Sequence, residues 1–334
     1  MAAPRPDPDP FPAMRNVRTY PLASRPSLVH LKDFCKVPEP LPGFAGFVDA
    51  LPDILAGAQF KDLVARIVAA KRNGRPVAVA LGAHVLKVGL APLVIDLMRR
   101  GVIDHVAMNS AGAIHDFEIA TAGRTSEDVA AQLAKGDFGF ADETGKGLAE
   151  AARRGCEPPT GEGGGFGRGL GRLILDQKAP HRDLCVSAEA VRLGLGITIH
   201  ACLGADIVHM HPAADGAAVG QASMTDFKHV CRFVHGLDGG VWMNIGCAVV
   251  LPEVFLKAVS VAINLGAKLD LMTTANLDML RQYRAETNVV QRPPGKGISI
   301  LGQHEILLPL LRMAVLAKLA EAGWKAPERK GARA

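Results

Sequence analysis

The chain has 334 residues, of which 49% are hydrophobic, 21% charged and only 5% aromatic, and its formal net charge is +5. Abundant Ala, Val, Leu and Gly favour packed α/β layers over a β-sandwich. Lysine and arginine are dispersed without interleaved aromatic residues, so the charge does not indicate nucleic-acid binding. No apolar run reaches the roughly 18 residues that span a bilayer. No two cysteines have C-x-x-C spacing. We expect a cytoplasmic protein with reduced thiols and no membrane partner.

Hydrophobic periodicity divides the chain into an arm and one domain. Residues 1–40 begin with a proline-rich stretch that lacks the apolar segment of a signal peptide, and they predict an extended N-terminal arm. Residues 41–325 predict a single domain. Helices are expected at 60–73, 90–100, 126–135, 146–154, 170–177, 183–193, 226–235, 252–264 and 305–320. Strands are expected at 77–81, 104–108, 197–200, 241–244 and 269–273. This alternation predicts a Rossmann-like, doubly wound parallel sheet.

Small and polar residues collect after the predicted strands, where open parallel sheets bind their ligands. Small residues let the backbone approach a ligand closely, and helix N-termini favour phosphate groups. The candidate cofactor contacts are Gly82, His84, Ser110, Ala111, Gly112, Asp206, Gly246, Thr274, Ala275 and Asp278. No G-x-G-x-x-G follows the first strand. The glycine-rich stretch 163–169 lies between predicted helices, so it is interpreted as a linker or lid.

Six short segments, in order, resemble bacterial-type members of the deoxyhypusine synthase family. They are Ala80-Leu81-Gly82 running to Gly89, Gly101-Val102-Ile103-Asp104, Ser110-Ala111-Gly112-Ala113, Gly246-Cys247-Ala248-Val249-Val250, Gly266-Ala267 with Thr273-Thr274-Ala275, and Leu307-Leu308-Pro309-Leu310-Leu311. The resemblance spans roughly residues 75–320. It implies a Rossmann-like fold, a homotetramer, bound NAD, and aminobutyl transfer from spermidine through an imine on a lysine.

The resemblance also implies residue roles. By position it assigns cofactor contacts to Ser110, Ala111, Gly112, Thr274 and Ala275, and a polyamine-binding carboxylate to Asp116. No lysine stands where the family carries its catalytic lysine, and the nearest candidate is Lys296. Because only an amine forms the covalent imine, modification of a protein lysine is not expected.

The main hypothesis is therefore an NAD-dependent enzyme that oxidises a small amine or polyamine, or transfers part of it. Asp116 and Glu118 would pair with the cationic substrate. His115 or His304 would move the proton, with Glu305 beside His304. Lys296 is a displaced candidate for the imine lysine.

Two alternatives remain open from the sequence. His209 and His211 flank one residue and, with Asp215, would supply ligands for a divalent metal in a hydrolase or lyase. The histidines would otherwise hydrogen-bond loop backbone. The other alternative is a non-catalytic nucleotide-binding relative, because a fold does not fix a function.

Overall fold

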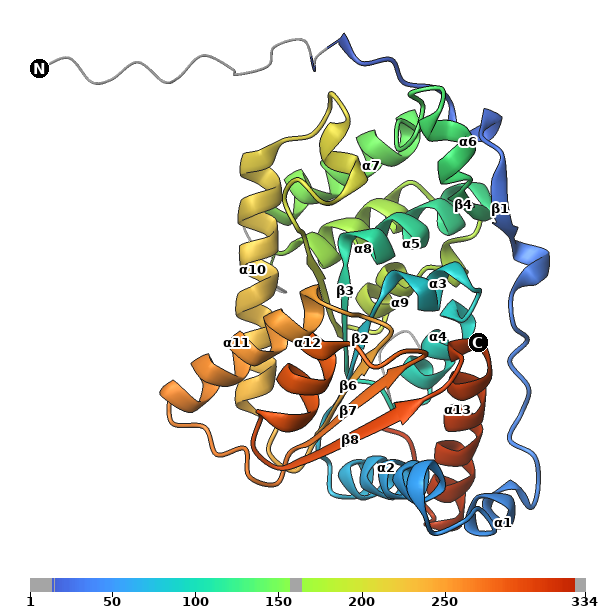
Figure 1. Cartoon of the computed structure of the whole chain (residues 1–334), viewed down its shortest axis with the longest axis vertical. Helices are drawn as coiled ribbons and strands as arrows, with labels where there is room; N and C mark the ends of the chain where they lie inside the picture. Colours follow the sequence, from blue (N-terminus) through green and yellow to red (C-terminus); the bar gives the residue numbers. More distant parts are fainter. Residues whose placement is uncertain (1–13, 15, 157–163, 328–334) are drawn as a thin grey trace, which may run out of the picture.

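The computed structural model describes residue 14 and residues 16–156 and 164–327. Its main element is a six-stranded sheet in the order β5-β3-β2-β6-β7-β8, and every neighbouring pair is parallel (Figure 1). The strands are β2 (Val77–Leu81), β3 (His105–Asn109), β5 (Gly196–His200), β6 (Val241–Ile245), β7 (Thr273–Asp278) and β8 (Lys296–Leu301). The predicted doubly wound parallel α/β fold is confirmed.

The order of the strands locates the switch in topology. The chain passes from β2 outward to β3 and β5, and then crosses to the other side of β2 to form β6, β7 and β8. This is the arrangement of two mononucleotide-binding halves in the Rossmann fold, with the switch between β2 and β6. Ligands of such sheets bind in the crevice beyond the carboxyl ends of the strands at this switch.

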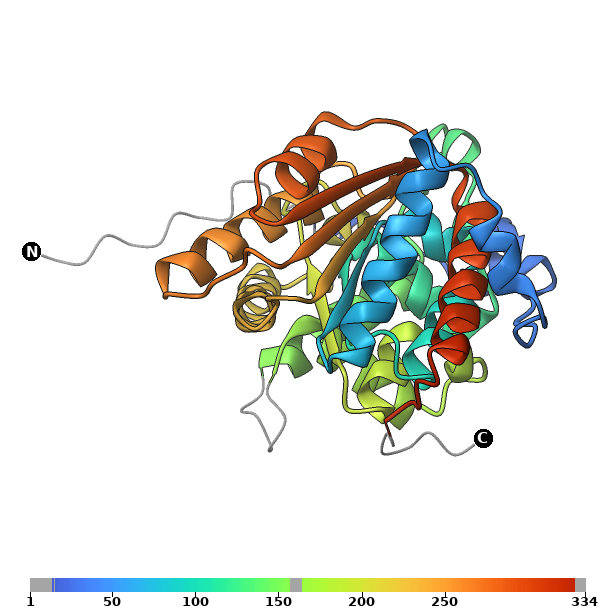
Figure 2. The same cartoon turned by 90° about the horizontal axis from the view of Figure 1, so that it is seen from below.

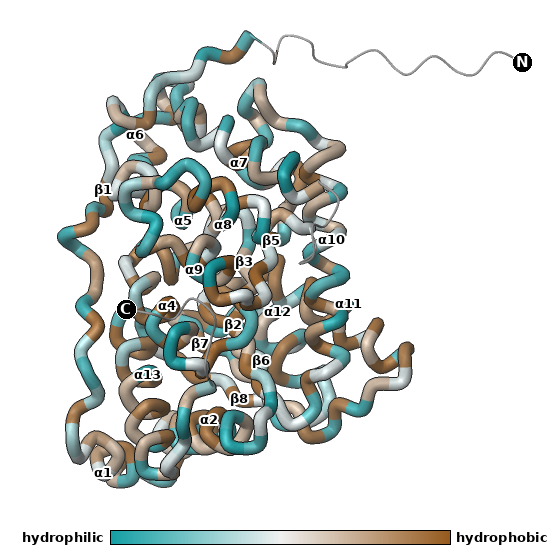
Figure 3. The backbone as a smooth tube through the Cα atoms, turned by 180° about the vertical axis from the view of Figure 1, so that it is seen from behind, coloured by the Kyte–Doolittle hydropathy of each residue, from teal (hydrophilic) through white to brown (hydrophobic). Residues whose placement is uncertain are grey.

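Helices cover both faces of the sheet, as Figure 2 shows. One face packs on α2 (Leu55–Arg72), α4 (Ala91–Arg99), α8 (Phe166–Asp176), α9 (Val186–Arg192) and α13 (His304–Glu321). The other packs on α10 (Gly216–His235), α11 (Val250–Asn264) and the π-helical turn Glu286–Gln291. Side chains alternate between the two faces: Val77, Val79 and Leu81 of β2 join the first core, and Ala78 and Ala80 join the second. Hydrophobic segments gather toward the central strands in Figure 3.

The remaining elements surround the carboxyl edge and the outer end of the sheet (Figure 1). They are α1 (Phe44–Asp49), α3 (Ala83–Lys87), α5 (Ser110–Ala122), α6 (Val129–Leu133), α7 (Asp142–Cys156) and α12 (Tyr283–Ala285), with short 3-10 turns at Leu22–Ser24, Leu31–Asp33, Arg182–Leu184 and Ile207–Met210. Within the described residues, no helix is long and apolar enough to cross a membrane.

Several elements differ from their sequence prediction. The last predicted strand is displaced to β7, and β8 was not predicted, because the Asn, Asp and Gly residues of these segments disfavour strands in isolation. Residues 126–135 begin as a strand, β4 (Arg124–Glu127), rather than as a helix. Residues 110–122, for which no helix or strand was predicted, form α5. Its N-terminus is capped by the Asn109 side chain, and Gly123 ends it in the left-handed conformation.

The N-terminal arm is attached to the fold at several places, two of which involve β4 and α5. Its strand β1 (Ser27–His30) pairs antiparallel with β4. Arg25 is 3% exposed and donates two hydrogen bonds to the Glu118 carboxylate of α5, at 2.8 and 2.7 Å. The arm therefore packs on the helix that follows β3. The predicted boundary between arm and domain at residue 40 stays a prediction.

Candidate active site

The crevice at the switch is lined by backbone. Gly82 follows β2 and Gly246 follows β6, and a Cβ atom on Gly82 would lie 1.9 Å from the Gly246 carbonyl oxygen. Gly246 itself has φ +68°, and a Cβ there would lie 2.6 Å from Cε1 of His304. Only glycine fits these two positions. The two strand ends therefore meet closely beneath the ring of His304.

Two histidines form a hydrogen-bonded pair at this crevice. His304 is 1% exposed, and its Nε2 lies 3.3 Å from the Leu277 carbonyl, so Nε2 carries the hydrogen. The other nitrogen of His304, Nδ1, then accepts from Nδ1 of His84 at 3.1 Å. This assignment leaves Nε2 of His84 unprotonated, as a free base, when both rings are neutral.

The charges around His84 are mixed. Burial lowers the pKa of His84 below its usual value, and His304 and Lys87 lower it further, whereas Glu305 and Asp278 act in the opposite direction. The ring is therefore neutral at physiological pH. Asp278 ends β7, is 6% exposed, and accepts from the backbone N–H of Met279 at 2.7 Å. Glu305 is exposed in the first turn of α13.

Lys87 is the residue that the sequence analysis missed. It lies three residues after His84 on α3, the spacing that brings side chains to one helix face. Among the described residues it has no ion-pair or hydrogen-bond partner, and its charge lowers the pKa of both His84 and His115. The His84-x-x-Lys87 spacing was the available signal. An unpaired ammonium beside a crevice suits a phosphate or a carboxylate.

His115 of α5 lies close to His84 and Lys87. Burial lowers its pKa to about 4, so the ring is neutral. Its Nδ1 lies 2.7 Å from the Thr125 hydroxyl, which donates in turn to Glu118 at 2.6 Å. The hydroxyl therefore accepts from His115 Nδ1–H, which leaves Nε2 as the basic nitrogen. We call His84, Lys87, His115, Asp278, His304 and Glu305 the carboxyl-edge cluster.

The N-terminus of α5 borders the same edge, directly after β3. Ser110 is fully buried, and its hydroxyl has no hydrogen-bond partner in the described part of the chain. Ala111 is half-buried, and the N–H of Gly112 is capped by Asn109 at 2.9 Å. A buried hydroxyl without a partner at a helix N-terminus suits a ligand oxygen.

Two predicted substrate carboxylates have structural roles instead. Asp116 is fully buried and accepts from the N–H groups of Val186 and Ser187, at 2.7 and 2.9 Å, at the start of α9. Glu118 is bound by Arg25, Thr125 and Thr144. Both were predicted to pair with a cationic substrate because they follow β3 closely. The helix α5, absent from that prediction, turns them into the interior.

Four other predicted site residues lie away from the crevice. Lys296 begins β8 and is exposed at the amino edge of the sheet, about 16 Å along the strand from its carboxyl end. It is therefore misplaced for an imine lysine. Thr274 and Ala275 are buried inside β7, at 1% and 0% exposure, rather than after it. Asp206 accepts from the N–H of Cys202 at 2.7 Å and holds a turn.

The predicted metal site is not formed. In the described ranges no group of three or more His, Cys, Asp or Glu side chains could hold a metal ion. Asp215 caps α10 through the N–H groups of Ala217 and Ala218. His211 accepts from the N–H of Ala213 at 3.1 Å and packs on Gly145 of α7. His209 lies 4.0 Å from Asp206. His211 therefore holds loop backbone, the simpler of the two interpretations of the sequence, whereas His209 faces the Asp206 carboxylate.

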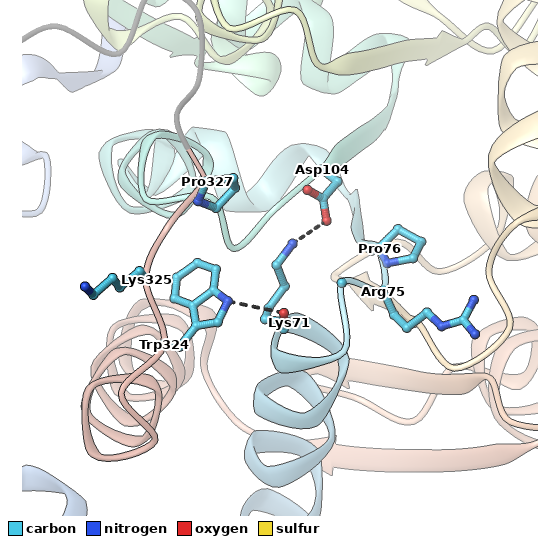
Figure 4. Close-up of a pocket in the computed structure, with 8 residues that line it drawn as sticks. Lys71, Arg75, Pro76, Asp104, Trp324, Lys325 and Pro327 are labelled. Atoms are coloured by element: carbon cyan, nitrogen blue, oxygen red, sulfur yellow. Dashed lines mark hydrogen bonds and ion pairs between the residues drawn. The ribbon is translucent and has the colours of Figure 1, made fainter.

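A cavity of about 420 Å³ lies at the opposite, amino edge of the sheet (Figure 4). Lys71 pairs there with Asp104 at 2.7 Å, and the indole N–H of Trp324 donates to the Lys71 carbonyl at 3.2 Å. Although it is larger than the other described cavities, it lies away from the carboxyl ends where parallel sheets bind ligands. We do not assign the active site to it.

Comparison with known proteins places the chain by its fold. No family model and no curated protein matches the sequence. Among solved structures, the chain is similar to AgrE in a ternary complex with ornithine and NAD+, with a TM-score of 0.52, 13% identity, and coverage of 78% of this chain and 33% of that one. The chain thus spans about a third of the AgrE chain that it matches.

Two further structures are similar. A conserved LOR/SDH protein from Methanococcus maripaludis S2 has a TM-score of 0.51 at 13% identity, covering 80% of this chain and 71% of that one. A protein named as a deoxyhypusine synthase from Entamoeba histolytica has a TM-score of 0.46 at 10% identity, covering 86% and 95% of the two chains. At 13% identity, the likeness to AgrE and to the LOR/SDH protein shows the fold alone. Membership of the deoxyhypusine synthase family stays a prediction from the sequence.

Proposed function

We propose that this chain is an NAD-dependent enzyme that oxidises a small amine at the carboxyl-edge cluster. The observation that carries the proposal is the His84–His304 pair at the switch between β2 and β6. The pair leaves a neutral, basic nitrogen on His84 in the crevice where this fold binds ligands. Because the pKa of His84 is lowered, this nitrogen stays unprotonated and can accept a proton from a bound ammonium.

The residues at this edge fit a dinucleotide. The glycines Gly82 and Gly246 leave the crevice lined by backbone, and Ser110 offers a buried hydroxyl without a partner among the described residues. Lys87 supplies an unpaired positive charge for a pyrophosphate. The similar AgrE structure is a complex with ornithine and NAD+, which supports the same cofactor class here. Bound NAD would supply the hydride acceptor.

The chain's own groups would handle the proton and the substrate charge. His84 Nε2 would take a proton from the bound ammonium, so that the free amine can lose hydride from the neighbouring carbon. His304 holds the His84 ring by its hydrogen bond. Asp278 and Glu305 would offset the positive charge on the amine and on its oxidised, iminium form. Water or a second amine would then attack the iminium carbon.

The transfer reaction of the deoxyhypusine synthase family differs in one requirement. That reaction passes the substrate fragment to a lysine, and Lys296 lies at the wrong edge for this role. We therefore propose oxidation, or transfer to a small amine acceptor, rather than modification of a protein lysine. A homotetramer, which the resemblance implies, is part of this proposal.

The test is to mix the protein with NAD and a panel of small amines, and to follow reduced nicotinamide by its absorbance. Turnover that His84→Gln abolishes would support the proposal. His235→Gln is the matched control, because His235 is exposed at the end of α10, and it should leave the rate unchanged. If both variants turn over like the parent, His84 is not the base.

A further inference from the structure

A second cavity lies at the carboxyl end of β5, in the half of the sheet that contains β2 and β3. Its volume is about 250 Å³, and its walls come from β5, α10 and α11. Val219, Met224 and Phe227 of α10 line it together with Leu203 and with Val254 of α11. We call it the β5 pocket. A cavity of roughly 150 Å³ already admits a benzene ring, so the β5 pocket has room for a phenyl group or a short alkyl chain.

The polar groups of the β5 pocket are neutral and engaged. His200 is 3% exposed, burial lowers its pKa to about 4, and its Nε2 lies 3.2 Å from the Thr198 hydroxyl. The hydroxyl of Ser223 accepts from the N–H of Ala201 at 3.1 Å. Of the described residues that line the pocket, none is charged. A cationic nitrogen would therefore lose its hydration there without gaining a partner.

The mouth of the β5 pocket is also apolar. Leu203 is 65% exposed and Met224 is 55% exposed. Large exposed apolar side chains beside a cavity are typical of ligand-binding grooves. A free apolar group would shed its hydration by entering, which favours binding by the hydrophobic effect.

The pocket lies at the same carboxyl edge of the sheet as the active-site crevice. Helix α11 begins at Val250, four residues after Gly246, and Val254 lies one turn further along it. The strand β5 is two strands from β2, which is roughly 10 Å across the sheet. An amine whose nitrogen lies at His84 would need a group that extends roughly 10 Å from the nitrogen to reach the pocket.

We infer that the substrate of the proposed amine oxidation is a monoamine with an aromatic or branched alkyl group, and that the β5 pocket holds this group. The inference rests on the proposed function. It replaces the polyamine of the sequence prediction, because the two carboxylates assigned to a polyamine in this half of the sheet are Asp116 and Glu118. Both are buried and bound by protein groups. A second amino group has no carboxylate partner among the described residues of the pocket.

The test is a pair of calorimetric titrations, with 3-phenylpropylamine and with spermidine, each run with and without saturating NAD. The wild type should bind 3-phenylpropylamine more tightly than spermidine. Met224→Glu places a carboxylate at the mouth of the pocket. It should weaken 3-phenylpropylamine binding by about tenfold, a loss of about 1.4 kcal/mol, and should strengthen spermidine binding. Leu271→Glu is the control, because Leu271 is 70% exposed just before β7, at the amino edge.

Each outcome decides the inference. Tighter binding of spermidine by the wild type, or equal affinities of Met224→Glu and Leu271→Glu for both amines, would overturn it. Sedimentation of the same samples shows whether the apolar face instead forms a contact between two copies of the chain. If Met224→Glu changes the assembly state and leaves the amine preference unchanged, the apolar face is an interface and the inference is wrong. If NAD fails to bind, the proposed function fails, and the titrations without NAD still decide which amine the pocket prefers.

Discussion

Replacing Arg25 with Met tests the structural role given to Glu118. The two side chains are 2% and 1% exposed and make two hydrogen bonds, at 2.8 and 2.7 Å. Removing one partner of a buried ion pair costs roughly 3–5 kcal/mol, because the other charge is left buried. The hydroxyls of Thr125 and Thr144 still donate to Glu118, so we expect the lower end, about 3 kcal/mol.

The assay is urea unfolding followed by circular dichroism. A loss of about 3 kcal/mol is a large part of the 5–15 kcal/mol that holds a typical domain. Arg281→Met is the control, since Arg281 is exposed and has no partner within the described residues. The double variant Arg25→Met, Glu118→Gln should recover part of the loss, because it removes the buried charge. A loss below about 1 kcal/mol for Arg25→Met would refute the reasoning, and Glu118 would again be a candidate for substrate binding.

Three further predictions concern the crevice and the core. Gly82→Ala should lower the free energy of unfolding by about 1–3 kcal/mol through overpacking. Gly220→Ala, which has open space at its Cβ inside α10, should instead raise it by roughly 0.5–1 kcal/mol. Equal urea midpoints for the two variants would contradict this. Amine oxidation should slow as pH falls through the lowered pKa of His84, below the usual 6.5; a pH-rate profile without this limb would exclude that base. Burial raises the pKa of Asp226 from 3.8 to about 8, so the folded state favours the protonated carboxyl. The free energy of unfolding should therefore decline as the pH rises from 3.8 to about 8. Asp226→Asn should flatten that decline, as thermal unfolding across the window would show.

The sequence predicted the parallel α/β fold because buried parallel strands are short apolar runs separated by helices. The run 77–81 matches β2 in both bounds. The prediction was less accurate where polar residues lie inside elements. Asn276 of β7 is buried at 1% exposure, and it bonds to Asn244 of β6 and to Glu286. These partners lie 32 and 10 residues away along the chain. Hydrophobic periodicity therefore does not show that the side-chain amide of Asn276 is hydrogen-bonded and can be buried in a strand.

The candidate site was predicted in part for the same reason. His84 and Asp278 were selected because they follow predicted strands, and His304 as a proton carrier at the start of a predicted helix. The structure brings the three into one cluster. Asp116 and Glu118 were selected by the same rule. They lie in the interior because Asn109 starts a helix directly after β3. Glu118 is also bound by Arg25 of the arm, which lies 93 residues earlier in the chain. Such long-range partners decide whether a carboxylate faces a ligand or the core.

Calorimetric titration of the metal-stripped protein with NAD tests the central claim most directly. We predict binding in the micromolar range by the wild type, and its loss in Gly82→Ala, since a Cβ at this position would force the ends of β2 and β6 apart. Gly220→Ala should bind as the wild type does. Absence of heat from the wild type at millimolar NAD would contradict the claim that the carboxyl-edge cluster is a dinucleotide-dependent site.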